Sequence, residues 1–144
     1  MATFDAATYT TLLVVDDDIC QLELRSLVLK ISGFTVLTAA SPIEALSILA
    51  EPRRYKVNVA ILDYEMPTMN GCVLAGYLKA RYPDLKIILH SGLVDIPESE
   101  MSSIDSFVPK GEGIARLLGE VSPSCKIARI GSSRERSVNP KGEL

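Results

Sequence analysis

The chain has 144 residues, a net charge of −3 and a hydrophobic content of 47%. This length suits one domain with a sizeable core, and the apolar content argues against a disordered chain. No apolar run approaches the roughly 18 residues needed to span a bilayer, and residues 1–11 lack the basic and apolar blocks of a secretory signal. The three cysteines show no CxxC spacing, so we expect free thiols, no zinc site and a cytoplasmic location.

Strand-like apolar runs alternate with segments of helical spacing. In chain order, the expected elements are strand 12–15, helix 19–31, strand 34–38, helix 42–49, strand 57–62, helix 72–81, strand 86–91, strand 106–108 and helix 112–121. Gly33 is placed as a C-cap, and Ser41 and Glu44 form a capping box around a proline at the first helical position. Residues 93–105 include Pro97 and predict at most a short or irregular fourth helix. The alternation predicts an α/β fold with a doubly wound, five-stranded parallel sheet.

Basic residues gather at the C-terminal end of the chain. Residues 122–144 contain five basic and two acidic side chains, so the rest of the chain is more acidic than its total charge indicates. An acidic body argues against nucleic-acid binding by the folded part. Hydrophobic periodicity also fails from Ser122 onward. We therefore expect a folded domain over residues 11–121 and a flexible basic tail over 122–144.

Polar side chains follow four of the apolar runs. In chain order these are Asp16, Asp17 and Asp18, then Asp63, then Ser91, then Lys110. The carboxyl ends of the strands form the ligand site of open α/β sheets. Several carboxylates gathered there repel one another unless a cation joins them. The chain therefore predicts an acidic pocket for a divalent metal, with a lysine and a hydroxyl at its rim.

These residues resemble the receiver domains of two-component response regulators. The stretch Val-Val-Asp-Asp-Asp at 14–18 is similar to the acidic first-strand motif, and Leu-Asp-Tyr-Glu-Met-Pro-Thr-Met-Asn-Gly at 62–71 is similar to the phosphorylation loop. Ser91 matches the switch hydroxyl, and Lys110 matches the lysine after the fifth strand. The resemblance covers about residues 11–121 and implies the flavodoxin-like (βα)5 receiver fold.

The resemblance also implies a reaction. Asp63 would accept a phosphoryl group from a phosphohistidine of a sensor histidine kinase or a phosphotransfer protein. The implied cofactor is Mg²⁺, held by Asp17, Asp63 and the backbone carbonyl of Glu65, with Asp16 acting mainly through water. Such a carboxylate is a usable nucleophile toward phosphorus once a metal neutralises the incoming oxygens. We expect slow hydrolysis of the aspartyl phosphate but no turnover enzyme.

Three further residues carry implied roles in switching. Lys110 would contact one phosphoryl oxygen, Ser91 would donate a hydrogen bond to another, and Phe107 matches the aromatic switch position. No DNA-binding or enzymatic output segment is visible, so the effect would run through protein contacts with an unidentified output protein. We expect neither nucleic acid nor membrane as a partner, and a homodimer is left open.

Two other functions fit parts of the pattern. Glu65 stands two residues after Asp63, at the spacing of the general acid in Mg²⁺-dependent phosphohydrolases, although no cap domain or substrate pocket is visible. A degenerate receiver that serves only for binding is the other alternative. It is kept open because Pro109 precedes Lys110, where the family usually has Lys-Pro, and this order excludes a cis Lys-Pro bond. Among the remaining polar residues, Asp18 is expected to cap a helix and the single histidine to be packed or half-exposed.

Overall fold

The computed structural model describes residues 10–53 and 56–121, so the expected tail over 122–144 lies outside the described residues. All strands belong to one parallel sheet with the order β2-β1-β3-β4-β5. The strands are β1 (Thr11–Val15), β2 (Thr35–Ala39), β3 (Val59–Leu62), β4 (Lys86–Ser91) and β5 (Ser106–Pro109). The predicted doubly wound, five-stranded sheet is confirmed.

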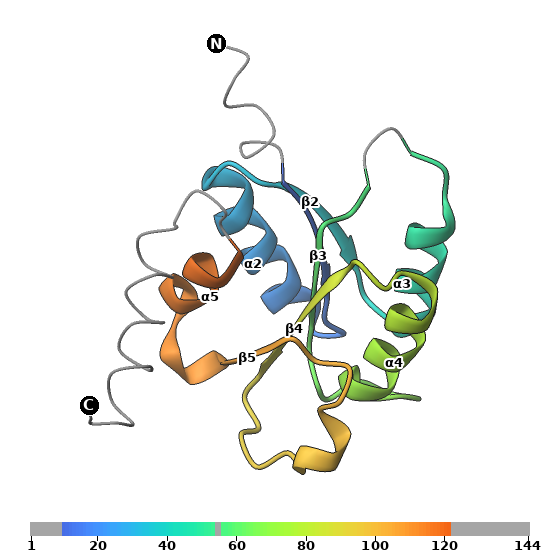
Figure 1. Ribbon diagram of the computed structural model, residues 1–144. Coiled ribbons are helices and arrows are strands. Elements are labelled where there is room, and N and C mark those ends of the chain that lie inside the picture. The colour runs from blue at the N-terminus through green and yellow to red at the C-terminus, as the bar shows by residue number, and fades with distance from the viewer. Residues whose placement is uncertain (1–9, 54–55, 122–144) are drawn as a thin grey trace, which may run out of the picture.

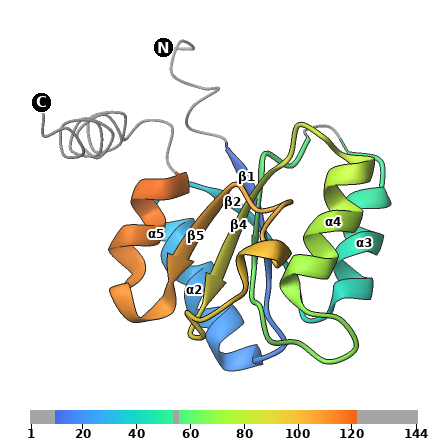
Figure 2. The same ribbon diagram turned by 60° about the horizontal axis from the view of Figure 1, so that its bottom comes forward.

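Two layers of helices cover the sheet. The helices are α2 (Ile19–Ile31), α3 (Pro42–Ala50), α4 (Gly71–Arg81) and α5 (Ile114–Val121), with 3₁₀ turns η2 (Glu98–Glu100) and η3 (Lys110–Glu112). Helices α2 and α5 lie on one side of the sheet, and α3 and α4 lie on the other (Figures 1 and 2). No helix in residues 10–53 and 56–121 is long and apolar enough to cross a membrane.

The core consists of one apolar layer on each side of the sheet. Leu13 and Val15 of β1 pack in the layer beneath α3 and α4, whereas Leu12 and Val14 pack in the layer beneath α2 and α5. This division follows from the two-residue repeat of a strand, whose successive side chains point to opposite faces. Burial on both faces explains why the central strands read as continuous apolar runs.

Helix α2 forms where its apolar spacing predicts it, but the buried face is not its most apolar one. Leu22, Ser26 and Leu29 are buried, whereas Leu24 and Leu27 are 63% and 54% exposed. The buried stripe follows the helical i, i+4, i+7 spacing. The same side of α2 also carries Arg25, whose side chain is only 11% exposed.

Capping side chains fix the ends of two helices as expected. Asp18 accepts a hydrogen bond from the N–H of Gln21 and caps α2. Ser41 Oγ accepts one from the N–H of Glu44, whose carboxylate in turn accepts from the N–H of Ala40. The C-cap of α2 is Ser32 and not Gly33 as expected; Gly33 is the next residue and has a φ of +104°, a left-handed conformation that glycine adopts without steric cost.

Two elements begin later than expected, namely β3, which begins at Val59 and not at Val57, and the last described helix. Strand β5 continues to Pro109, and α5 begins only at Ile114, because η3 and Gly113, with a φ of +89°, intervene. Between β4 and β5 the described chain forms a single 3₁₀ turn, η2, directly after Pro97. This confirms the short fourth helix. Among the described residues no peptide bond is cis.

Candidate functional site

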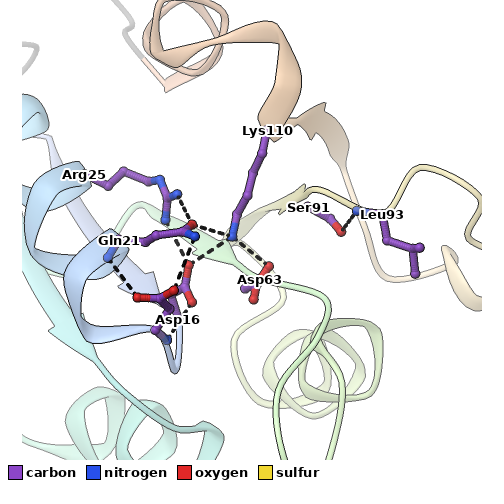
Figure 3. Close-up of polar contacts among 8 residues, drawn as sticks. Asp16, Gln21, Arg25, Asp63, Ser91, Leu93 and Lys110 are labelled. Atoms are coloured by element: carbon purple, nitrogen blue, oxygen red, sulfur yellow. Dashed lines mark hydrogen bonds and ion pairs between the residues drawn. The ribbon is translucent and has the colours of Figure 1, made fainter.

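The carboxyl ends of β1, β3 and β5 bring charged side chains together at one edge of the sheet. Asp16 follows β1, Asp63 follows β3 and Lys110 follows β5. Figure 3 shows the Lys110 ammonium reaching down between the two carboxylates. Lys110 Nζ lies 3.1 Å from Asp16 Oδ2 and 3.1 Å from Asp63 Oδ1. Residues separated by 94 positions in the sequence therefore share one ion-pair network.

Asp16 is the most enclosed member of this network. Its side chain is 1% exposed, and its Oδ1 accepts a hydrogen bond from the N–H of Asp18 at 2.9 Å. Its Oδ2 is shared by Lys110 and by Arg25, whose Nη1 lies at 3.1 Å. Burial alone would raise the pKa of Asp16, but the Asp18 N–H and the two cations together lower it. Asp16 is therefore a buried anion held by three donors of the protein.

Asp63 lies in a different electrostatic environment. Burial raises the pKa of Asp63, the nearby Lys110 lowers it, and the negative charge of Asp16 raises it again, so that the pKa lies above its ordinary value. The folded protein thus disfavours a second negative charge beside Asp16. Because burial and the charge of Asp16 both disfavour ionised Asp63, an additional cation beside this carboxylate would be stabilising.

Replacing Asp63 with asparagine is expected to stabilise the protein at pH 7. A pKa raised in the folded state means that ionised Asp63 reduces stability above that pKa, and that this loss is absent below the unfolded value of about 3.9. We expect Asp63→Asn to increase the free energy of unfolding at pH 7 by on the order of 1 kcal/mol, measured by urea denaturation. The gain should fade toward pH 3.5. A variant less stable than the wild type at pH 7 would contradict this account.

Asp17 completes an acidic cluster that a cation fits. Carboxylate oxygens of Asp16, Asp17 and Asp63 all lie within 4.8 Å of one another, and Asp17 is exposed. Oxygen ligands from a few carboxylates, with positions left for water, suit Mg²⁺. The protein's own donors already occupy both oxygens of Asp16. Asp17 and Asp63 are therefore the carboxylates best placed for direct contact with a cation.

The loop after Asp63 is held in place from both sides. The N–H of Gly71 donates to the carbonyl of Tyr64 at 2.9 Å, and the Tyr64 hydroxyl donates to Glu100 Oε1 at 2.8 Å. Asn70 caps α4 by accepting from the N–H of Val73. The side chain of Glu65 is exposed. Its backbone carbonyl accepts no hydrogen bond from the described residues.

Ser91 and Phe107 do not join the ion-pair network. Ser91 ends β4 and is fully buried, and its Oγ accepts a hydrogen bond from the N–H of Leu93 at 2.9 Å (Figure 3). Phe107 is half-buried against the core layer beneath α3 and α4. It lines a separate cavity of about 320 Å³ together with Ile96 and Met101. The structure therefore brings Asp16, Asp17, Asp63 and Lys110 together, with Ser91 at the neighbouring strand end.

Two residues of the network were not anticipated from the sequence. Gln21 Oε1 accepts hydrogen bonds from Lys110 at 3.0 Å and from Arg25 at 3.2 Å, and so joins the two cations beside Asp16 (Figure 3). The available signal was the position of Arg25, midway between Leu22 and Leu29 on one helical face. A charged residue on a buried stripe requires a buried partner.

Comparison with known proteins decides the family. The model of the response regulator receiver domain matches residues 12–122. The chain belongs to this family. The receiver is 33% identical over 120 residues to the sensor kinase CckA of Brucella abortus. These residues make up 81% of the chain and 12% of that kinase. It is 36% identical over 108 residues to the C4-dicarboxylate transport transcriptional regulatory protein DctD of Rhizobium meliloti, covering 73% of the chain and 23% of that protein. The receiver thus spans a small part of these curated relatives.

Solved structures agree with this assignment. The response regulator TrrA of Thermotoga maritima, solved in complex with Mg²⁺-BeF, has a TM-score of 0.70 and 29% identity, covering 78% of the receiver and 96% of that chain. The CheY-like receiver domain protein of Methanospirillum hungatei has a TM-score of 0.72 and 24% identity, covering 85% of the receiver and 98% of that chain. The second likeness supports the flavodoxin-like fold only. Receiver domains are signalling modules.

Proposed function

We propose that this receiver is a phosphoacceptor response regulator, phosphorylated on Asp63 by a histidine kinase or a phosphotransfer protein. The observation that carries the proposal is the bridging Lys110, whose ammonium lies 3.1 Å from both Asp16 and Asp63. An ammonium in this position can exchange its contact with a carboxylate for a contact with an incoming phosphoryl oxygen through a small movement of the side chain. The departure at Pro109, which precedes the lysine, does not prevent Lys110 from reaching the pocket.

Mg²⁺ fits the acidic cluster of this receiver. Asp17, Asp63 and the carbonyl of Glu65 would hold the ion, and Asp16, whose oxygens already accept from protein donors, would act through water. When bound, the ion neutralises the charge of the phosphoryl oxygens and offsets repulsion among the carboxylates. The TrrA relative was solved with Mg²⁺-BeF, which supports the choice of metal.

The chain's own residues then supply the transfer. A carboxylate oxygen of Asp63 attacks the phosphorus of the donor phosphohistidine, the P–N bond breaks, and the histidine leaves with its electron pair. Lys110 turns from the Asp63 carboxylate to a phosphoryl oxygen. Asp16 keeps Arg25 and the N–H of Asp18 during this exchange, so no buried carboxylate is left without a partner.

Switching would involve the end of β4. Ser91 Oγ accepts from the N–H of Leu93 in this structure, and rotation of its hydroxyl toward a phosphoryl oxygen would move the following loop. Phe107 borders a cavity of about 320 Å³ that Val94 and Ile96 also line, so the ring has open space beside it in which to turn. Phosphorylation of Asp63 would in this way shift the end of β4 and its loop between two conformations, and the shift would change the affinity for an output protein.

The proposed donor is a histidine kinase, and the comparisons support that class. TrrA, which is 29% identical to this receiver, has been solved in complex with the histidine kinase ThkA, with a TM-score of 0.70. For the alternative phosphohydrolase, Glu65 would have to act as a general acid inside the site. Its side chain is exposed, and the acidic cluster among residues 10–53 and 56–121 consists of Asp16, Asp17 and Asp63. The geometry favours the phosphoacceptor.

Intact mass after incubation with acetyl phosphate and Mg²⁺ tests the proposal. We expect one added phosphoryl group per chain, lost in Asp63→Asn and in EDTA, because the nucleophile and the charge-neutralising ion are then absent. Beryllofluoride binding, followed by NMR, distinguishes fast hydrolysis from lack of reactivity. A chain that gains neither a phosphoryl group nor beryllofluoride is a binding module only. Turnover of small phosphoesters with Glu65 required would favour the phosphohydrolase.

A further inference from the structure

A second cavity lies between α2 and α5, on the face of the sheet away from Phe107. Its volume is about 450 Å³, within the range of roughly 300–1,000 Å³ that small-molecule sites occupy. Leu24 and Val28 of α2 and Ile114 of α5 give it apolar walls. Arg25 and Lys110, which also contact Asp16, form its polar end. The cavity therefore has the composition of a binding site, with an apolar body and a few convergent polar groups.

His90 lies in the wall of this cavity without a hydrogen-bond partner. The residue is 4% exposed, and neither Nδ1 nor Nε2 has a partner among the described residues. Buried polar groups are nearly always paired, so a buried imidazole without a protein partner beside a cavity has a hydrogen-bonding position to offer a ligand group. Burial, with Arg25 and Lys110 nearby, lowers the pKa of His90 to about 4. At neutral pH the ring is uncharged and offers one N–H donor.

The charge of the cavity selects the kind of ligand. Among the described residues no acidic side chain lines it, whereas Arg25 and Lys110 both do. Arg25 uses Nη1 for Asp16 and Nη2 for Gln21, which leaves other N–H groups of its five for an additional acceptor. Lys110 already contacts three oxygen atoms, so it contributes charge rather than a free donor. An anionic acceptor with an apolar body complements this arrangement.

We propose that the cavity between α2 and α5 binds a small amphipathic carboxylate, with its carboxylate on Arg25 and His90 and its apolar part against Leu24, Val28 and Ile114. The ligand class is an aryl or short alkyl carboxylate. Arg25 and Lys110 line the cavity and also contact Asp16. A ligand in the cavity would therefore lie directly beside the ion pairs of Asp16. Binding itself does not depend on phosphorylation, and it is measured without Mg²⁺ or a phosphodonor.

Titration of the ¹⁵N-labelled full chain with benzoate and hexanoate tests the proposal. We expect saturable shifts of amides that line the cavity, with at least tenfold weaker binding of benzamide and hexanamide. Val28→Phe, which fills the cavity, should abolish the response. Leu27→Phe, on the exposed side of the same helix, should leave it intact. His90→Leu should weaken binding at least threefold. This second variant decides the test in case Val28→Phe does not fold.

Several results would overturn the proposal. These are the absence of saturable shifts with either acid, equal binding of acid and amide, and a response that survives both Val28→Phe and His90→Leu. Cavity resonances that move on dilution without any ligand would assign the cavity to contact with a second copy of the chain instead. Each outcome is independent of whether Asp63 accepts a phosphoryl group.

Discussion

Gly71→Ala is expected to destabilise the receiver by about 2–4 kcal/mol and to abolish phosphorylation of Asp63. A Cβ at Gly71 would overlap the carbonyl oxygen of Asp63 and lie 2.9 Å from Leu89 Cδ1. The oxygen belongs to the backbone, so it cannot turn aside as a flexible side chain would. Either α4 retreats from the sheet or Asp63 is displaced from Lys110. Urea denaturation and acetyl phosphate labelling measure the two effects.

Gly76→Ala provides a matched control in the same helix. The nearest atom outside α4 to a Cβ at this position is Ser103 Oγ at 3.8 Å, an ordinary contact distance. Alanine stabilises a helix interior by about 0.5–1 kcal/mol relative to glycine. We therefore expect Gly76→Ala to be slightly more stable than the wild type and fully phosphorylated. Equal losses in the two variants would show that α4 tolerates no methyl group anywhere and that the contact with Asp63 is not special.

Arg25→Met is expected to lower the free energy of unfolding by about 2 kcal/mol at pH 7. The change keeps most of the apolar stem but removes the guanidinium that lies 3.1 Å from the buried Asp16. Asp16 then retains Lys110 and the N–H of Asp18, so the loss is smaller than for a carboxylate left alone. Chemical denaturation measures it directly.

The pH dependence separates this effect from simple loss of packing. The pKa of Asp16 is lowered in the folded state despite burial, by the Asp18 N–H, Lys110 and Arg25. A lowered pKa contributes stability above the unfolded value of about 3.9, and this contribution is lost as the pH falls through the folded value. The difference between wild type and Arg25→Met should therefore be complete at pH 7 and shrink below about pH 4. A difference that is unchanged at pH 3 would indicate packing alone.

Arg116→Met is the corresponding exposed control. Arg116 of α5 pairs with Glu112 of η3, four residues earlier, at 2.6 Å, but the two side chains are 44% and 53% exposed. Exposed pairs of this kind contribute about 0.3–0.5 kcal/mol, because water screens them and their ordering has an entropic cost. We expect Arg116→Met to change stability by less than about 0.5 kcal/mol. If Arg116→Met lost as much stability as Arg25→Met, burial of the ion pair could not be the reason for the effect of Arg25→Met.

The sequence alone established the order of the strands along the chain and the polar residues that follow them. A central strand of a parallel sheet is buried on both faces, so it requires a continuous apolar run, as residues 12–15 and 59–62 show. The first polar residue after such a run must lie at the carboxyl edge of the sheet. Asp16, Asp63 and Lys110 meet there for that reason. Their catalytic roles stay predictions until phosphorylation is measured.

Only the tertiary structure decided which side of α2 is buried and what that side does. Helical periodicity establishes that residues 19–31 form a helix, but several apolar residues lie around it, and the neighbouring sheet selects the stripe through Leu22 and Leu29. That choice leaves Leu24 exposed and turns Arg25 toward Asp16. It also forms the cavity beside His90. Ion pairs and cavities between distant segments depend on packing in three dimensions, which local spacing does not encode.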